Sequence, residues 1–371
     1  MAEWITSITN QHVRELSPYE SARRLFSADE NNSGQIWLNA NEAPMSEDFS
    51  VNSALFNRYP DCQPQEVISS YARYAGISSG QVIATRGADE GIELIIRAFC
   101  EPGKSSVLIC PPTYGMYAIS AQTFNVGVHK APLTDDFSLN LDAMGEYVDK
   151  VNVVFLCSPN NPTGTRIEAE QIVAVLNMFK DKALVVLDEA YIEFDADATQ
   201  SALLSTYNNL VILRTLSKAH ALAGIRCGFV LSNTQVCQTL MKVIAPYPVP
   251  APVAQVAAQA LNAEGIAVMY ARVKTLQQGI DTIVKRLSQI DQLTLCGDTK
   301  ANFVLFKTPY KNKLMAFLVS KGVIIRDQSK QHNLDNCLRI TVGSEQENDI
   351  LLSLIQGFFQ EQAISSTKEP S

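Results

Sequence analysis

The sequence predicts an α/β protein with a large domain built on a mostly parallel sheet of seven strands and a smaller α+β domain after it. Short runs of apolar, β-branched residues alternate with segments of helical periodicity through the middle of the chain. Most of these runs are continuously apolar, as expected for strands that helices cover on both faces. From about residue 253 a long helical stretch leads into further strands, which indicates a second domain.

Each strand is predicted from an apolar run that ends in polar or glycine-containing residues. The large domain is expected to hold strands at residues 82–85, 107–110, 126–129, 153–157, 184–187, 210–213 and 228–231. The smaller domain is expected to hold strands near 302–306, 323–326 and 337–342.

Helices between the strands are indicated by apolar stripes at three- and four-residue spacing. One stripe ends at Phe99, and another ends at Phe179. Thr165 and Glu168 stand at capping-box spacing, which predicts that the second of these helices opens there. The resulting division is an N-terminal arm at 1–34, a large domain at 35–260 and a small C-terminal domain at 261–371.

Composition excludes several classes of function. The 371 residues include 30 basic and 38 acidic side chains, a net charge of −8 that disfavours nucleic-acid binding. Residues 243–263 are uncharged, but four prolines interrupt them, so no membrane segment is expected. Eight cysteines are scattered without a CxxC pair, so we expect no metal cluster and no disulfide framework. With no secretory signal visible, a cytoplasmic location is expected.

Polar residues follow four of the predicted strands, where ligands of parallel sheets collect. Ala88 and Asp89 follow a glycine turn that feeds a helix, which suits a phosphate but equally a helix cap. Asn161 lies in the turn SPNNPTG, where it could be a turn residue or a ligand donor. Asp188 ends an apolar strand and requires a partner, which could be a salt bridge or a protonated ring nitrogen.

The fourth strand end carries Ser217 and Lys218, with Arg226 eight residues after the lysine. A lone lysine is usually a solvated surface residue. Lys218 is flanked by small and apolar residues, however, and partial burial would lower its pKa enough for imine chemistry.

The four strand ends together are more specific than any one of them. In chain order they supply an anion cradle, an amide, a carboxylate and a lysine. A pyridoxal phosphate site requires a lysine for the Schiff base, a carboxylate for the pyridinium N–H and a cradle for the phosphate. The set therefore predicts pyridoxal 5'-phosphate as cofactor.

The motifs SPNNPTG, LDEAYIEF and TLSKAHALAGIRCGF resemble those of class II aminotransferases, which are pyridoxal phosphate enzymes of fold type I. More narrowly, the chain from about residue 10 to about 355 resembles the histidinol-phosphate aminotransferase family. The segments that carry this resemblance are LSPYESARR (16–24), LNANEAP (38–44), RYPD (58–61), TRGADEGIELIIRAF (85–99), PPTYGMY (111–117), GVIIRDQS (322–329) and CLRITVGSEQEN (337–348).

The resemblance implies a role for each matching residue. Lys218 would bond to the cofactor and shuttle the proton, and Asp188 would pair with the ring nitrogen. Asn161 and Tyr191 would bind the ring 3-oxygen, and Tyr114 would stack on the ring face. The residues implied for the cofactor phosphate are Ala88, Asp89, Thr215, Ser217 and Arg226.

The resemblance also implies a homodimer in which Tyr59 reaches the cofactor phosphate of the neighbouring subunit. Tyr19, Asn41, Arg326 and Arg339 would face the substrate. Guanidinium groups can bind either a phosphate or a carboxylate, and this pocket must accept both histidinol phosphate and glutamate. His220 stands where relatives more often carry a residue such as Phe, and we interpret it as a packing variant.

The function that the resemblance implies is reversible amino transfer between L-histidinol phosphate and 2-oxoglutarate by a ping-pong mechanism. Two enzymatic alternatives use the same fold and cofactor residues: an aromatic amino acid aminotransferase and a threonine-phosphate decarboxylase. A regulatory ligand sensor is an alternative of another class. Such a sensor would carry a basic DNA-binding module before residue 16 and would not need the lysine.

Overall fold

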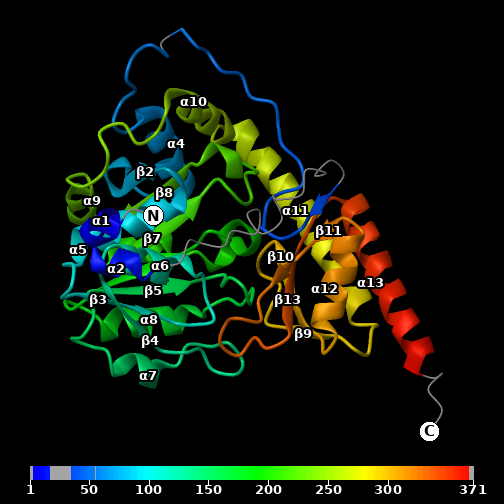
Figure 1. The fold of residues 1–371 in the computed structure, drawn as a ribbon. Coiled ribbons are helices and arrows are strands. Elements are labelled where there is room, and N and C mark those ends of the chain that lie inside the picture. Colours follow the sequence, from blue (N-terminus) through cyan, green and yellow to red (C-terminus); the bar gives the residue numbers. More distant parts are fainter. Residues whose placement is uncertain (1–2, 17–34, 55, 367–371) are drawn as a thin grey trace.

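The computed structural model describes residues 3–16, 35–54 and 56–366 (Figure 1). Its largest sheet has seven strands in the order β2-β8-β7-β6-β5-β3-β4, and β8 runs antiparallel to the other six. The predicted seven-stranded, mostly parallel sheet is confirmed. The strands are β2 (Val82–Thr85), β3 (Ser106–Ile109), β4 (Gly127–Lys130), β5 (Val153–Cys157), β6 (Leu184–Asp188), β7 (Leu210–Thr215) and β8 (Gly228–Ser232).

Apolar side chains project from both faces of this sheet, so a core forms on each face. On β5, Val153 and Phe155 enter one core, whereas Val154 and Leu156 enter the other. This explains why the strands are continuously apolar. The surrounding helices are α4 (Gln65–Ala75), α5 (Gly87–Phe99), α6 (Met116–Thr123), α7 (Leu141–Gly145), α8 (Ala169–Met178), α9 (Thr234–Leu240) and α10 (Ala251–Ala260).

The C-terminal part has its own antiparallel sheet in the order β12-β13-β10-β9, and most residues of a further core come from it. Its elements lie together on one side of the molecule (Figure 1). They are α11 (Ala263–Leu287), β9 (Thr294–Cys296), β10 (Phe303–Lys307), α12 (Lys311–Ser320), β11 (Val323–Ile324), β12 (Arg326–Asp327), β13 (Cys337–Thr341) and α13 (Glu345–Ser366).

An N-terminal segment joins this second part. Strand β1 (Ile36–Trp37) pairs in parallel with β11, almost 290 residues later in the chain. The remaining described elements are α1 (Glu3–Ile8), α2 (Gln11–Arg14) and four 3₁₀ helices at Ser79–Gln81, Ile192–Ala198, Ser201–Ser205 and Ala223–Ile225. No helix in the described part of the chain is both long enough and apolar enough to cross a membrane.

Some local predictions were wrong. Helix α8 begins at Ala169 with Glu168 as its N-cap, so Thr165 forms no capping box. The helical stretch after residue 253 is broken at Asn262, whose side chain accepts a hydrogen bond from the Gly265 N–H and starts α11 anew. The segment predicted as one strand at 323–326 forms two strands that pair with different partners.

Candidate active site

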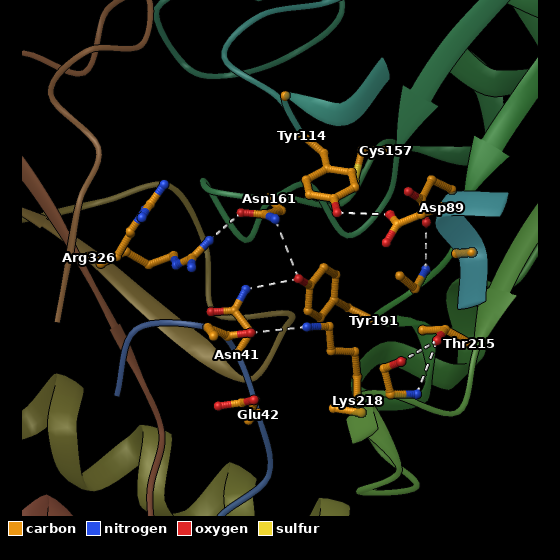
Figure 2. Close-up of a pocket in the computed structure, with 18 of the residues that line it drawn as sticks. Asn41, Glu42, Asp89, Tyr114, Cys157, Asn161, Tyr191, Thr215, Lys218 and Arg326 are labelled. Atoms are coloured by element: carbon orange, nitrogen blue, oxygen red, sulfur yellow. Dashed lines mark hydrogen bonds between the residues drawn. The ribbon is translucent and has the colours of Figure 1, made fainter. Parts of the chain in front are cut away.

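A cavity of about 520 Å³ lies where the carboxyl ends of the central strands face the C-terminal sheet. Figure 2 shows the side chains that point into it. The structure brings thirteen sequence-predicted residues to this one cavity. They are Asn41, Ala88, Asp89, Tyr114, Asn161, Asp188, Tyr191, Thr215, Ser217, Lys218, Arg226, Arg326 and Arg339.

One end of the cavity is a cradle for an anion at the N-terminus of α5. Gly87 has φ +74°, and a Cβ there would stand 2.6 Å from Nη2 of Arg226. The turn therefore requires glycine, and it leaves the first N–H groups of a 13-residue helix facing the cavity. Arg226 itself has φ +57°, which turns its side chain back over the helix end, where it pairs with Asp89 at 3.1 Å.

Two hydroxyl groups complete the cradle. Thr215 Oγ1 donates to Ser217 Oγ at 2.9 Å, and the Ser217 N–H donates to Thr215 Oγ1 at 3.0 Å. Arg226 Nη1 donates to Ser217 Oγ at 3.4 Å. Backbone N–H groups, hydroxyls and one guanidinium therefore converge, which is the donor set that a phosphate monoester accepts.

Asp188 ends β6 and is buried beneath the cavity. Burial raises the pKa of its carboxyl group to about 6. Tyr117 donates to Asp188 Oδ2 at 2.7 Å, and the Ala190 N–H donates to Oδ1 at 3.0 Å. Both hydrogen bonds favour the ionised carboxylate, which can accept a further proton donor from the cavity.

Lys218 enters the cavity from the loop that follows β7. Its Nζ donates to the Ala40 carbonyl at 3.1 Å and lies 5.6 Å from the centre of the Tyr191 ring. Burial, with the Arg339 guanidinium nearby, lowers the pKa of the Lys218 ammonium to about 8. The amine is therefore neutral and nucleophilic to a far greater extent near neutral pH than that of an exposed lysine.

The Tyr191 hydroxyl is the centre of a small amide network. Asn41 Nδ2 donates to it at 2.9 Å and Asn161 Nδ2 at 3.4 Å, and the two amides converge on the hydroxyl (Figure 2). Burial raises the pKa of Tyr191, so its hydroxyl remains protonated. Tyr114 completes the wall and donates to Asp89 Oδ1 at 2.9 Å.

Two arginines from the C-terminal sheet close the other end. Arg339 is buried, with Nη1 donating to Asn161 Oδ1, Nη2 donating to the Asn39 carbonyl at 2.9 Å, and its guanidinium over the Phe303 ring. Arg326 lies beside it on β12 and lines the same cavity. A second anion, separate from the one in the cradle, would be held here.

One predicted residue in the described part of the chain lies outside this cavity. Tyr59 does not line it; its side chain is 81% exposed and stacks on Tyr247 with ring centres 4.4 Å apart. Tyr19 lies outside the described residues. His220 is buried edge-on to Tyr74, and burial lowers its pKa to about 3, so it is a neutral packing group.

Sequence reasoning missed several residues around the cavity. Glu42, Cys157, Gln328 and Gln331 line it, and Tyr117 lies behind Asp188. Glu42 and Gln328 belong to the motifs LNANEAP and GVIIRDQS. Their position beside Asn41 and Arg326 in the sequence could have indicated that they line the site. Tyr117 ends the motif PPTYGMY, but nothing in the sequence shows that its hydroxyl points to Asp188.

The cavity fits pyridoxal 5'-phosphate group by group. The cradle suits its phosphate, Asp188 suits a protonated ring nitrogen, the network around Tyr191 suits the ring oxygen, and Lys218 suits the aldehyde. The fold and this site together define a fold-type I pyridoxal phosphate-dependent transferase.

Comparison with known proteins is in agreement. The model of the aminotransferase class I and II family matches residues 33–355. Histidinol-phosphate aminotransferase from Pseudoalteromonas atlantica is 58% identical over 98% of both chains, and that from Shigella boydii is 47% identical over 95% of this chain and 98% of its own. The structure of histidinol-phosphate aminotransferase from Sinorhizobium meliloti in complex with pyridoxal-5'-phosphate has a TM-score of 0.84, 23% identity, and coverage of 96% of this chain and 98% of its own. The chain belongs to the class I and II aminotransferases, and within them to the histidinol-phosphate aminotransferase family.

Proposed function

We propose that this protein transfers an amino group reversibly between L-histidinol phosphate and 2-oxoglutarate, giving imidazole acetol phosphate and L-glutamate, as a step of histidine biosynthesis. The observation that carries the proposal is one cavity that holds the cradle at α5, the arginines Arg326 and Arg339, and Lys218, whose pKa is lowered. The cradle at α5 takes the cofactor phosphate, and Arg326 with Arg339 takes the anion of the substrate.

The bound cofactor supplies an electron sink for the substrate carbon that carries the amino group. Lys218 Nζ would hold the cofactor through its aldehyde carbon and would move the proton to and from the substrate carbon. Asp188 holds the proton on the ring nitrogen, which keeps the sink effective. Asn161 and Tyr191 would donate to the ring oxygen, and Tyr114 would pack on the ring face.

Each half-reaction brings a different anion to the same arginines. Histidinol phosphate presents a phosphate, whereas glutamate and 2-oxoglutarate present carboxylates. A planar guanidinium can donate two parallel hydrogen bonds to either. Asn41 lies between Arg326 and Lys218 in the view of Figure 2, where its amide can orient the substrate.

Related activities use the same fold. Solved structures with this fold include an aromatic aminotransferase and an L-threonine-O-3-phosphate decarboxylase. The fold alone therefore does not select the substrate. The close relationship to histidinol-phosphate aminotransferases over nearly the whole chain favours histidinol phosphate over phenylalanine and threonine phosphate.

The proposal extends to assembly and location. We infer a cytoplasmic homodimer in which Tyr59 of each subunit serves the neighbouring cofactor phosphate, and Tyr19 faces the substrate. Tyr59 is exposed and outside its own cavity, which supports a role toward a second subunit. The chain is proposed to divide into an arm at 1–34, a large domain at 35–260 and a small domain at 261–371.

An absorbance experiment tests the function. The purified protein with pyridoxal phosphate is expected to show a visible band that disappears on addition of L-histidinol phosphate and returns with 2-oxoglutarate. A band that responds to phenylalanine or threonine phosphate but not to histidinol phosphate would replace the proposed substrate. Absence of any band would contradict covalent attachment at Lys218.

A further inference from the structure

A tyrosine behind the active site contacts the carboxylate that carries the proposed chemistry. Tyr117 is in the first turn of α6 and is completely buried, and its hydroxyl donates to Asp188 Oδ2 at 2.7 Å. It does not line the cavity. We therefore expect no direct contact with substrate or cofactor, and any part in the reaction is exerted through the residues that it touches, above all Asp188.

The ring of Tyr117 is held in one orientation. It stacks on Phe155 of β5, with ring centres 4.9 Å apart and planes 5° apart. Its other neighbour is Tyr114, whose ring it meets edge-on at 5.6 Å. Because Phe155 belongs to the central sheet, the hydroxyl is aimed at Asp188 from a rigid support.

We propose that Tyr117 is a positioning residue: it holds Asp188 ionised and aimed at the cofactor ring nitrogen, while its ring supports Tyr114 on the cofactor face. This inference rests on the proposed function. One buried side chain would thus align both the group that holds the ring nitrogen and the ring that stacks on the cofactor.

The charge balance around Asp188 explains why a donor is needed there. Burial opposes ionisation of this carboxyl, and the hydrogen bond from Tyr117 is the strongest influence in the opposite direction. Asp89 also opposes ionisation, whereas Lys218 favours it. The titratable groups that face the carboxyl are Tyr117, Cys157, Tyr191, Asp89 and Lys218.

Removal of the donor should therefore raise the pKa of Asp188, because a hydrogen bond to the charged form is lost. Asp188 must be ionised to hold the ring proton. The pH at which activity is lost on acidification should then move upward. Burial likewise keeps the Tyr117 phenol protonated, so it remains a donor throughout the working range.

The test compares Tyr117→Phe with Tyr71→Phe, both studied as holoenzymes. Tyr71 is the matched control, since it is equally buried, stacks on Phe229 and does not line the cavity. Tyr117→Phe is expected to retain cofactor, to lower kcat roughly tenfold with KM nearly unchanged, and to move the acidic limb of kcat/KM to higher pH. Its visible cofactor band should also titrate at a different pH, whereas Tyr71→Phe should match the unmodified protein in all of these.

A double variant separates positioning from packing. If Tyr117 acts through Asp188, Tyr117→Phe should cost little further activity once Asp188→Asn is present. Equal losses in both backgrounds would overturn the proposal, as would an unshifted acidic limb and band. This comparison distinguishes the two roles even if Tyr117→Phe lowers the melting temperature, because the loss of packing is the same in both backgrounds. The band titration uses no substrate, so its outcome is independent of whether histidinol phosphate is the amino donor.

Discussion

Arg326 and Arg339 stand directly opposite one another on the antiparallel strands β12 and β13. Both side chains line the cavity. Like charges in directly opposed positions of a sheet are unfavourable, because the two cations repel. An anion between them removes that repulsion, so this pairing favours a substrate that carries a phosphate or a carboxylate.

Replacement of Arg339 by lysine should weaken both half-reactions. Lysine keeps the charge but cannot reach Asn161 and the Asn39 carbonyl with the same fork. Arg339→Lys is expected to raise KM for histidinol phosphate and for 2-oxoglutarate by roughly tenfold or more. Arg286→Lys is the control, since Arg286 pairs with Asp349 outside the cavity. A KM increase for one substrate alone would show that the arginine does not serve both.

Lys218→Ala should abolish turnover and leave the cofactor bound only through its phosphate and ring contacts. The amine is both the covalent attachment and the proton carrier, so a loss of at least about a thousandfold is expected. Stopped-flow absorbance and steady-state assays measure this loss. Lys180→Ala, at an exposed lysine, should change neither reading. Turnover near the normal rate in Lys218→Ala would contradict the assigned role.

The pKa of Lys218 predicts how fast the cofactor-free protein takes up cofactor at different pH values. Only the neutral amine attacks the aldehyde, and with a pKa of about 8 the neutral fraction rises about tenfold between pH 7 and pH 9, then levels off. Growth of the visible band after mixing should follow this curve. An ordinary exposed lysine would keep gaining through pH 10, and such a profile would contradict the lowered pKa.

Tyr59 can be tested by mixing two inactive subunits. If Tyr59 completes the neighbouring site, a hybrid dimer of Tyr59→Ala and Lys218→Ala subunits contains one intact site. Random reassortment at equal concentrations would then restore about a quarter of normal activity, because half of the dimers are hybrids with one site in two working. The control mixes each variant with itself. If Tyr59→Ala alone has low activity and mixing restores none, Tyr59 serves the site of its own subunit.

The sequence predicted the large sheet well for a physical reason. Strands buried on both faces must be apolar at every position, so their ends are marked by the first polar or glycine residue. Strand β9 was missed because it is a short edge strand whose residues are only partly buried. The break before α11 was missed because a single cap, Asn262, interrupts an otherwise continuous helical pattern.

The candidate site was predictable where residues follow strand ends, as Asp188 and Lys218 do. It was not predictable where a contact joins distant segments. The bond from Arg339 to the Asn39 carbonyl spans 300 residues and depends on how the C-terminal sheet packs against the first one. Tyr117 shows the same limit, since its role depends on the direction of one hydroxyl within a core.

The pairing of β1 with β11 has a consequence for the order in which the protein is made. The last strand of the large sheet ends at Ser232, so that sheet, with Asp188 and Lys218, can assemble while the ribosome is still adding residues. In the segment at 36–41, the main-chain groups of Ile36, Leu38 and Asn41 bind partners that are synthesised only after residue 300, whereas Ala40 and the Asn41 side chain also contact the earlier Lys218 and Tyr191. The cavity wall on that side therefore forms only near the end of translation. A nascent chain can bind the cofactor before it can enclose a substrate.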